Sequence, residues 1–233
     1  MSTVRAAGLT KRFGTVDAVR ELDFKVTPGI TAFLGPNGAG KTTTLRMLLG
    51  LIRPTFGTAT IDGKRYAELR HPRRVVGAVL EATGFHPGRT ARRHLEILAV
   101  AGGLPLARVD QVLDQVGLTD AARRRAGGFS LGMRQRLGLA GALLGDPGVL
   151  ILDEPANGLD PAGMAWLRGL LRGFAGQGRT VIVSSHVLAE VAQTADRAVV
   201  ISGGRLRYCG PLEGMSEDGL EAGFLRLTEE AQR

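Results

Sequence analysis

The stretch from Gly35 to Thr43 has the residue types and spacing of a loop that binds phosphate. It matches G-x-x-x-x-G-K-[ST], follows the apolar run from Ile30 to Leu34 and precedes a helical pattern. Glycines let backbone N–H groups turn toward phosphate oxygens, and the following helix adds the positive end of its dipole. The alternative is a glycine-rich turn that only closes a strand, but the flanking strand and helix favour the phosphate loop. Its residues are Gly35, Pro36, Asn37, Gly38, Ala39, Gly40, Lys41, Thr42 and Thr43.

Two carboxylates close a second buried run, in which Val149–Leu152 leads into Asp153 and Glu154. Buried strands seldom end on a carboxylate pair unless it serves a cation or a reaction. In P-loop enzymes a lysine contacts the β- and γ-phosphates, while a threonine and a strand-end aspartate hold Mg²⁺. We therefore expect Lys41 to contact phosphate and Thr42 and Asp153 to hold Mg²⁺. Glu154 is expected to face the attacking water.

Three further side chains stand where strands or loops could present them to a ligand. Glu81 follows the apolar run 75–80, and His186 follows the run 180–185. A strand-end carboxylate is more often a solvated loop end, and a solitary histidine usually carries no function. Phe13, in the stretch before the phosphate loop, could be a core residue or a flat face for an adenine ring.

Ser130 begins a helical pattern that extends to about residue 144, and serine is a good N-cap. Arg134 and Arg136 lie in the first turns of this helix, where the dipole disfavours cations. An anion that docks there would remove the conflict. The alternative is that both arginines are simply exposed.

Composition indicates a globular protein: of 233 residues, 44% are hydrophobic and 22% are charged. This length suits one large domain, or a domain with an inserted lobe, at roughly 100–200 residues per domain. No run reaches the ~18 apolar residues of a membrane helix, and the first residues lack the apolar core of a secretory signal. We therefore expect a cytoplasmic protein, and because Cys209 is the only cysteine, one with no internal disulfide.

The net charge of +8 raises the question of nucleic-acid binding. Arginine supplies the basic excess in a chain rich in alanine and glycine, and biased codon usage would give the same excess. Only 5% of the residues are aromatic, so few side chains could stack on bases, and no nucleic acid is expected. Arginines concentrate between residues 65 and 93, where a solvated face, a protein partner or an anionic lipid surface all fit.

Periodicity predicts the elements that position these residues. Two short strands are expected at Val4–Leu9 and Ala18–Val26, joined through residues 11–14, and a hairpin is expected about Gly203 and Gly204. Residues 90–116 have helical periodicity, as expected of a lobe inserted between strands. The tail from residue 211 has a weak helical face that could pack on the domain or fray.

The order of these motifs resembles the ATP-binding subunit of an ABC transporter from Val4 to about Gly210. The resemblance implies that Phe13 stacks on adenine, that Glu81 stands where glutamine is usual and lies near Mg²⁺, and that His186 is the switch histidine. It also implies that Lys41, Glu154 and His186 are catalytic. Ser130 and Gly132 would bind the γ-phosphate of a partner subunit, and Asp160 would lie in a turn used across that dimer.

Three positions depart from the commonest pattern of such subunits. Leu131 and Met133 replace glycine and glutamine in Leu-Ser-Gly-Gly-Gln, and Glu81 replaces glutamine. This variant is similar to the drug and peptide exporter branch, of the daunorubicin and bacitracin resistance type. The sequence Phe224 to Thr228 also resembles the closing segment of that branch.

The expected fold is therefore α/β, a P-loop NTPase with a RecA-like core, an N-terminal antiparallel β-layer and an inserted helical lobe at about 82–145. Residues 1–210 would form this domain and 211–233 a short tail. The implied function is hydrolysis of ATP with Mg²⁺ by a head-to-tail homodimer that drives export through separate transmembrane permease subunits, at the cytoplasmic face of the membrane. The alternative is a soluble ABC ATPase that acts on ribosomes or DNA, although those usually have two nucleotide domains or a long coiled coil.

A third candidate function is that of a small-molecule kinase on the P-loop fold. It would leave the signature around Ser130, and also His186, unexplained.

Overall fold

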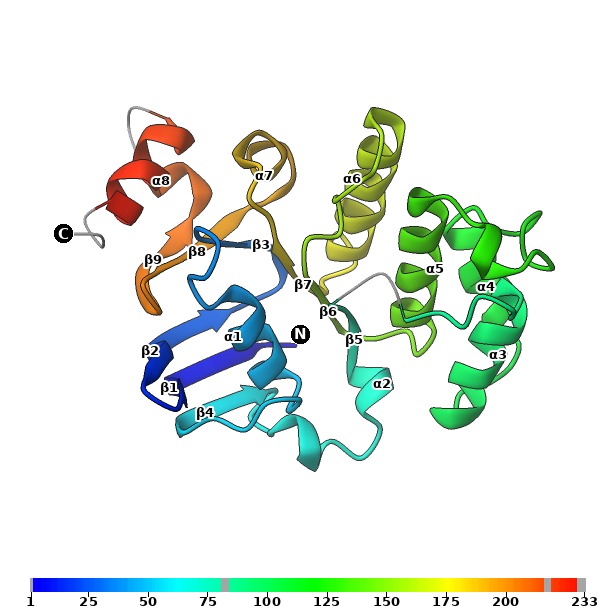
Figure 1. Cartoon of the computed structure of the whole chain (residues 1–233), viewed down its shortest axis with the longest axis horizontal. Helices are drawn as coiled ribbons and strands as arrows, with labels where there is room; N and C mark the ends of the chain where they lie inside the picture. Colours follow the sequence, from blue (N-terminus) through cyan, green and yellow to red (C-terminus); the bar gives the residue numbers. More distant parts are fainter. Residues whose placement is uncertain (1, 81–83, 216–218, 230–233) are drawn as a thin grey trace. The chain divides into compact units, whose positions relative to one another are not determined.

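The computed structural model describes residues 2–80, 84–215 and 219–229. Contacts divide the chain into two compact units: unit 1 contains residues 1–69 and 168–233, and unit 2 contains residues 70–167. Helix α6 (Pro161–Ala175) begins in unit 2 and ends in unit 1 (Figure 1). The predicted helical lobe falls inside unit 2, and its bounds and those of the predicted domain and tail stay predictions.

An antiparallel β-layer opens unit 1, in the order β2-β1-β4. Its strands are β1 (Val4–Phe13), β2 (Val16–Val26) and β4 (Phe56–Ile61). The two predicted N-terminal strands are confirmed, but the prediction that residues 11–14 form the connecting loop is wrong for residues 11–13. The ladder continues to the pair Phe13 and Val16, and the cross-strand partners Arg12 and Asp17 form an ion pair beside it (2.5 Å from Nε to Oδ1).

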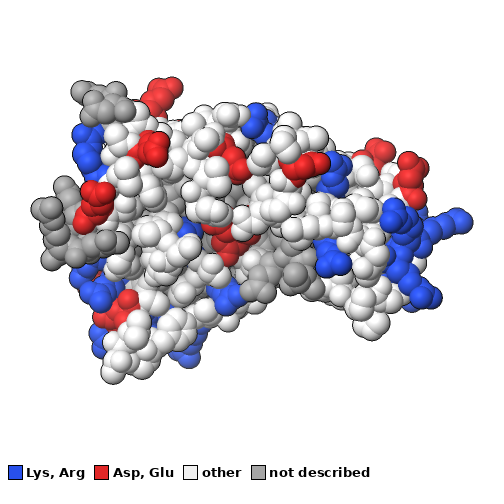
Figure 2. Space-filling model, turned by 45° about the horizontal axis from the view of Figure 1, so that its top comes forward, with Lys and Arg blue, Asp and Glu red and all other residues white. Residues whose placement is uncertain are grey.

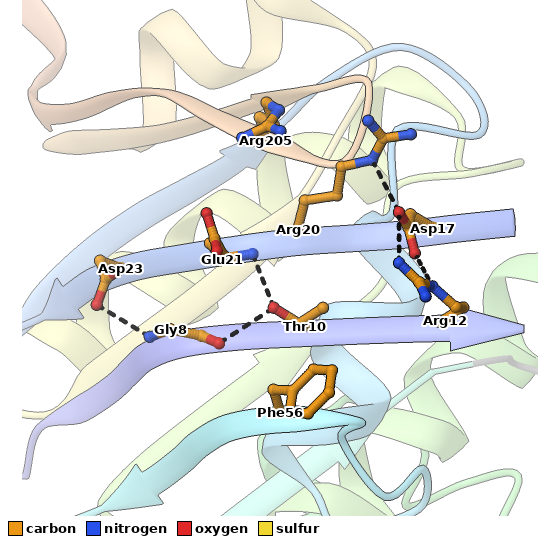
Figure 3. Close-up of a pocket in the computed structure, with 9 residues that line it drawn as sticks. All are labelled: Gly8, Thr10, Arg12, Asp17, Arg20, Glu21, Asp23, Phe56 and Arg205. Carbon is orange, nitrogen blue, oxygen red and sulfur yellow. Dashed lines mark hydrogen bonds and ion pairs between the residues drawn. The ribbon is translucent and has the colours of Figure 1, made fainter.

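The solvent-facing side of this layer holds a groove of about 520 Å³ (Figure 3). The β1–β2 register is irregular between Ala6 and Leu9, between Leu9 and Lys11 and between Lys11 and Arg12, and Gly8 and Thr10 of this stretch line the groove. The Thr10 hydroxyl oxygen accepts a hydrogen bond from Glu21 N (2.9 Å), and Asp23 Oδ1 accepts one from Gly8 N (3.0 Å). Glu21 has φ 47°, a left-handed conformation that side chains other than glycine rarely adopt. Side-chain hydrogen bonds therefore replace part of the regular ladder at this point.

Parallel strands form the second sheet region of unit 1, in the order β7-β3-β8-β9. β3 (Gly29–Leu34) pairs in parallel with β7 (Thr180–Ser184) and β8 (Arg197–Ser202), and β9 (Arg205–Pro211) pairs antiparallel with β8. The apolar runs of β3, β7 and β8 lack alternation, as expected for strands covered on both faces. The predicted hairpin about Gly203 and Gly204 is confirmed.

Helices and short 3₁₀ segments complete unit 1. They are α1 (Lys41–Leu48), η1 (Tyr66–Glu68), α7 (Leu188–Thr194), η3 (Leu212–Met215) and α8 (Leu220–Glu229). Helix α8 lies beside β8 and β9 in Figure 1. Thr228 is buried, and its carbonyl oxygen accepts a hydrogen bond from the Ser202 hydroxyl (3.4 Å). The described part of the tail thus packs on the unit.

Unit 2 combines two parallel strands with a group of helices. β5 (Val76–Val79) pairs with β6 (Val149–Leu152). The helical segments are α2 (Pro72–Val75), α3 (Ala91–Ala101), α4 (Arg108–Gln115), η2 (Ala126–Gly128) and α5 (Leu131–Leu143). The helical periodicity predicted for residues 90–116 is confirmed as α3 and α4. Among the described residues of either unit, no helix combines the length and apolar character needed to cross a membrane.

Candidate functional site

The phosphate loop connects the buried strand β3 to helix α1 and packs closely on its neighbours in unit 1. A Cβ atom on Gly40 would lie 2.5 Å from the carbonyl oxygen of Ala18, and one on Gly35 would lie 2.2 Å from that of Ile201. Gly40 also has φ 101°, which favours glycine. Both glycines are therefore required by the path of the loop, and Gly40 by its backbone conformation as well.

Lys41 is the first residue of α1 and is only 7% exposed. Its ammonium nitrogen donates hydrogen bonds to the carbonyl oxygens of Gly35 (2.6 Å) and Pro36 (3.2 Å), so the positive charge lies within the curve of the loop. Among the described residues, no side chain caps the N-terminus of α1. The dipole of α1 and the Lys41 charge thus act at the same place and favour an anion.

Phe13 ends strand β1 with its side chain 49% exposed, which excludes the alternative of a core residue. The ammonium group of Lys11 lies 4.9 Å from the centre of the ring. An exposed aromatic face with an adjacent cation can accept a flat ligand. The structure therefore leaves the adenine-stacking role open to Phe13, and that role stays a prediction.

His186 lies just beyond β7, at the edge of the parallel strands where the phosphate loop begins. β7 and β3 run in parallel with Ser184 opposite Phe33, so both strands deliver their following residues to the same edge. The Ser185 hydroxyl accepts a hydrogen bond from Val187 N (3.0 Å) and fixes the turn in which His186 is exposed. Within unit 1 the structure thus brings Lys41, Thr42 and His186 to one edge.

In unit 2, the half-buried Asp153 and Glu154 follow the buried strand β6. The Asp153 N–H donates to the carbonyl oxygen of Val79 (2.8 Å), which continues the β5–β6 ladder through this residue. Glu154 has φ 49°, a conformation that costs a non-glycine residue roughly 1–2 kcal/mol. Strain of this kind clusters at functional sites. The sequence contains no signal of this strain, and Glu81 lies outside the described residues.

Ser130 caps helix α5 as predicted, with its hydroxyl oxygen accepting a hydrogen bond from Met133 N (3.2 Å). Ser130 is exposed, and Gly132 is partly exposed in the first turn. A hydroxyl that accepts this bond still has its own O–H to donate. The first turn of α5 can therefore offer a donor to an external oxygen while it stays capped.

Arg134 and Arg136 are neither simply exposed nor directed to an anion at the N-terminus of α5. Arg134 Nε donates to the carbonyl oxygen of Phe129 (3.2 Å), and an Arg136 guanidinium nitrogen donates to that of Val116 (3.1 Å). Arg136 also lies over the ring of Trp166 at 4.1 Å. The expectation of an unmatched positive end, and the alternative of two exposed arginines, are both wrong. Carbonyl oxygens and an aromatic face compensate the charges instead.

Asp160 caps the beginning of α6, where its Oδ1 accepts a hydrogen bond from Gly163 N (2.7 Å). Aspartate is among the best N-cap residues, and Pro161 suits the first helical position. The side chain thus has a local structural role. The role across a dimer that the resemblance implies stays a prediction.

Comparison with known proteins places the chain in a family. Residues 19–157 match the ABC transporter family (ABC_tran). The chain belongs to the ABC transporter family. Two bacitracin transport ATP-binding proteins BcrA are similar: that of Bacillus licheniformis is 44% identical over 211 residues, covering 88% of this chain and 69% of the relative. That of Enterococcus faecalis is 41% identical over 207 residues, covering 87% and 67%.

More distant similarity agrees with this ABC assignment. The lantibiotic transport ATP-binding protein SrtF of Streptococcus pyogenes is 34% identical over 194 residues, covering 83% of this chain and 84% of the relative. A solved ATP-binding subunit of an ABC transporter superposes with a TM-score of 0.87 at 26% identity, covering 96% of this chain and 98% of that one.

The chain is thus an ATP-binding subunit of an ABC transporter and an ATPase, and it matches the drug and peptide exporter branch. The predicted P-loop NTPase fold is confirmed. These relatives are named as transport proteins, so the ribosome or DNA alternative gains no support.

One departure from the ABC signature pattern has a packing reason. Leu131, which stands in place of glycine, is 48% exposed and lies against the turn after Glu154. A Cβ atom on Gly158 in that turn would come within 2.0 Å of the Leu131 side chain. Leucine at position 131 thus fills the space above a glycine at position 158, and the two residues fit each other.

Gln135 is a residue of this region that the sequence analysis missed. It is 5% exposed, and its amide nitrogen donates to the carbonyl oxygen of Asn157 (3.4 Å). Its amide oxygen is buried without a hydrogen-bond partner among the described residues. A polar side chain on an otherwise apolar face of a helix was the available signal. Gln135 connects the signature helix α5 to the turn that follows Glu154.

Proposed function

We propose that this subunit binds ATP with Mg²⁺ on the phosphate loop and hydrolyses it to drive export through separate membrane subunits. The observation that carries the proposal is the position of the Lys41 ammonium group within the loop, at the uncapped start of α1. Backbone N–H groups of this loop and the Lys41 charge would hold the β- and γ-phosphates. Phe13 would stack on adenine.

The residues proposed to hold Mg²⁺ fit that ion. Thr42 offers a hydroxyl oxygen at the start of α1, and Asp153 offers a carboxylate at the end of β6; both are partly buried. Magnesium prefers such hard oxygen ligands and shares them with substrate phosphates. When bound it would neutralise negative charge on the β- and γ-phosphates. Glu81 would lie close to this ion, as the family resemblance implies.

In the proposed reaction, Glu154 orients the attacking water and accepts its proton as the water oxygen bonds to the γ-phosphorus. The bond to the β–γ bridging oxygen breaks, and ADP leaves with the electron pair. Lys41 stabilises the charge that develops on the phosphate oxygens, and His186 contacts the γ-phosphate as the switch histidine. The left-handed backbone at Glu154 supports its assignment, because strain there requires surrounding structure to maintain it.

The resemblance further supports a head-to-tail homodimer in the ATP state. Ser130 and Gly132 of one subunit would then donate to the γ-phosphate held by Lys41 of the other, with Asp160 in the adjoining turn. The capped hydroxyl of Ser130 is suited to this, since it can donate while it accepts from Met133 N. In a symmetric pair both composite sites form together.

The cargo and the location follow from the relatives. Because bacitracin and lantibiotic transport proteins are among them, we propose that the cargo is a peptide antibiotic and that the subunit acts at the cytoplasmic face of the membrane. The membrane subunit would contact unit 2, where Val100 and Leu106 are 70% and 55% exposed. Cross-linking from these two positions in membranes should capture that subunit, and cross-links only from unit 1 would contradict the contact.

Glu154→Gln tests the chemistry and the assembly together. The variant should bind ATP but hydrolyse it about 10²–10³ more slowly, so that bound ATP shifts the protein from monomer to dimer in size-exclusion chromatography. Adding Ser130→Arg should block the shift without loss of ATP binding. Glu213→Gln, which changes an exposed carboxylate far along the chain, is the matched control. A Glu154→Gln protein that saturates with ATP, hydrolyses it at the wild-type rate and stays monomeric would refute the assignment.

A further inference from the structure

Two segments of unit 2, residues 87–92 and 122–127, lie side by side and carry a group of arginines. Backbone hydrogen bonds join them, from Ala126 N to Arg89 O (2.9 Å) and from Arg92 N to Ala122 O (2.9 Å). An antiparallel bridge between Thr90 and Arg125 continues the contact. Four exposed arginines lie on these two paired segments, and together they are called the arginine patch: Arg89, Arg123, Arg124 and Arg125. Figure 2 shows Lys and Arg side chains gathered over this helical unit.

Little negative charge balances the arginine patch. Asp120 is the only acidic residue in the stretches 84–93 and 119–128. The nearby carboxylates Asp110 and Glu96 already bind Arg92 and Arg93. Across the described residues, no ion pair joins the patch to a carboxylate. The four positive charges lie on two hydrogen-bonded segments and repel one another, and an external anion would reduce that repulsion.

The surroundings of the patch discriminate among anionic partners. Exposed large apolar side chains in unit 2 are Val100, Leu106 and Leu131, and the two segments contain none of them. Protein interfaces depend on buried apolar or aromatic anchors. Single-stranded nucleic acids depend on exposed aromatics, whereas Phe129 is buried under Arg124, with 5.8 Å between the guanidinium and the ring centre. A charged lipid surface requires only accessible cations.

We propose that the arginine patch docks unit 2 onto an anionic lipid surface, with its guanidinium groups on the phosphate headgroups. Guanidinium matches phosphate through paired N–H donors and is always charged. The hydrogen bonds between the two segments already order the backbone that carries the arginines, so binding has to order only their side chains. The interaction is separate from the nucleotide site, so it does not depend on the proposed catalytic roles.

The test uses the whole chain and vesicles of phosphatidylcholine with or without phosphatidylglycerol. Wild-type protein should co-sediment with the anionic vesicles only, and salt should weaken binding as the Debye length falls from about 10 Å at 0.1 M to about 3 Å at 1 M. The variant Arg89→Gln, Arg123→Gln, Arg125→Gln should lose roughly 100-fold in vesicle affinity. It keeps Arg124, which packs on Phe129 beside Ser130.

The matched control removes the same charge from exposed positions of unit 1, with Arg5→Gln, Arg53→Gln and Arg205→Gln. This control should bind vesicles like the wild type, and both triple variants should keep the basal ATPase rate, which shows that they fold. An equal loss of vesicle affinity in both variants would overturn the proposal, because the net charge of the protein would then explain the binding. Binding to polyglutamate but not to vesicles would assign the patch to an acidic protein segment instead. Competition by inorganic phosphate at constant ionic strength would indicate a small-anion site.

Discussion

Helices α1 and α5 both begin in loops with the sequence features of an anion site, yet their first turns are completed differently. At α1, the residue before the helix is Gly40, which has no side chain to cap the N-terminus, and Lys41 adds its charge inside the loop. At α5, the side chain of Ser130 caps the helix. Arginines in its early turns bind carbonyl oxygens of their own unit.

The comparison separates the start of α1, where positive charge is concentrated, from the start of α5, which the side chain of Ser130 caps. The start of α1 brings the Lys41 charge and the positive end of the helix dipole to the same place, as expected for a primary phosphate site. The start of α5 is capped by Ser130, and the O–H of Ser130 and the N–H of Gly132 are the donors proposed for a phosphate. Under the proposed function, α1 would supply most of the affinity for nucleotide, whereas α5 would contribute to catalysis in the proposed dimer.

The largest expected effect tests the α1 side. Lys41→Ala removes the charge at the centre of the loop, and ATPase activity should fall by at least 10²–10³ according to the typical cost of one pre-organised donor. Nucleotide affinity should fall as well, since Lys41 acts on the bound ground state. Turnover and ATP binding by fluorescent-analogue titration measure both. Retained turnover, with wild-type contamination excluded, would contradict the role of Lys41 and of the start of α1 in phosphate binding.

Ser130→Asp sharpens the α5 side. Aspartate caps helices about as well as serine, so the helix and the melting temperature should be unchanged, but its carboxylate repels phosphate and cannot donate. Hydrolysis should fall by about 10²–10³ while the affinity of one subunit for nucleotide stays close to the wild type. Ser130→Thr, which keeps the cap and the hydroxyl, is the control and should retain activity. Normal turnover in Ser130→Asp would remove Ser130 from the chemistry.

The same two positions show how far the sequence could lead. The phosphate loop, the strand that ends at Asp153 and the cap at Ser130 depend on local residue order, and periodicity and spacing predict them directly. The strain at Glu154 could not be predicted, since no residue type signals a left-handed glutamate. It depends on how β6 and the following turn pack together.

Long-range side-chain contacts were the second limit. Arg136 reaches Val116 and Trp166, residues 20 and 30 positions away in the chain, and no local rule predicts such partners. Helix-dipole reasoning alone therefore gave the wrong prediction of an unmatched charge. The same limit applies to β1, where pairing with β2 and the cross-strand contact between Arg12 and Asp17 lie in residues that were predicted as a loop.

A smaller effect compares the two cap positions in stability. Gly40→Ala should destabilise unit 1, because φ 101° is strained for alanine and its Cβ would lie 2.5 Å from the Ala18 carbonyl oxygen. Strain alone costs about 1–2 kcal/mol, and the contact with backbone adds to it. Ser130→Ala has φ −61° and no such strain, so only the cap is lost, at about 1 kcal/mol. Urea unfolding of both variants measures the difference, and a costlier Ser130→Ala would reverse the expected order.

The smallest expected effect is a difference between the two units in how their stability depends on pH. His94 of α3, in the unit that contains α5, is partly buried and meets the Phe85 ring edge-on at 4.9 Å. Burial lowers the pKa of His94 from its ordinary value of 6.5, and the charge of Arg89 lowers it further. Because the unfolded chain then binds the proton more readily, unit 2 should lose stability as pH falls below about 6.5, down to the pKa of the folded state. Hydrogen exchange at pH 7 and at lower pH, corrected for intrinsic rates, should reveal earlier opening around α3 at the lower pH.

The control variant His94→Gln should remove that pH dependence while leaving exchange in α1 unaltered. An acid sensitivity of α3 that persists in His94→Gln would assign it to other groups, and one shared equally by α1 would remove the distinction between the units.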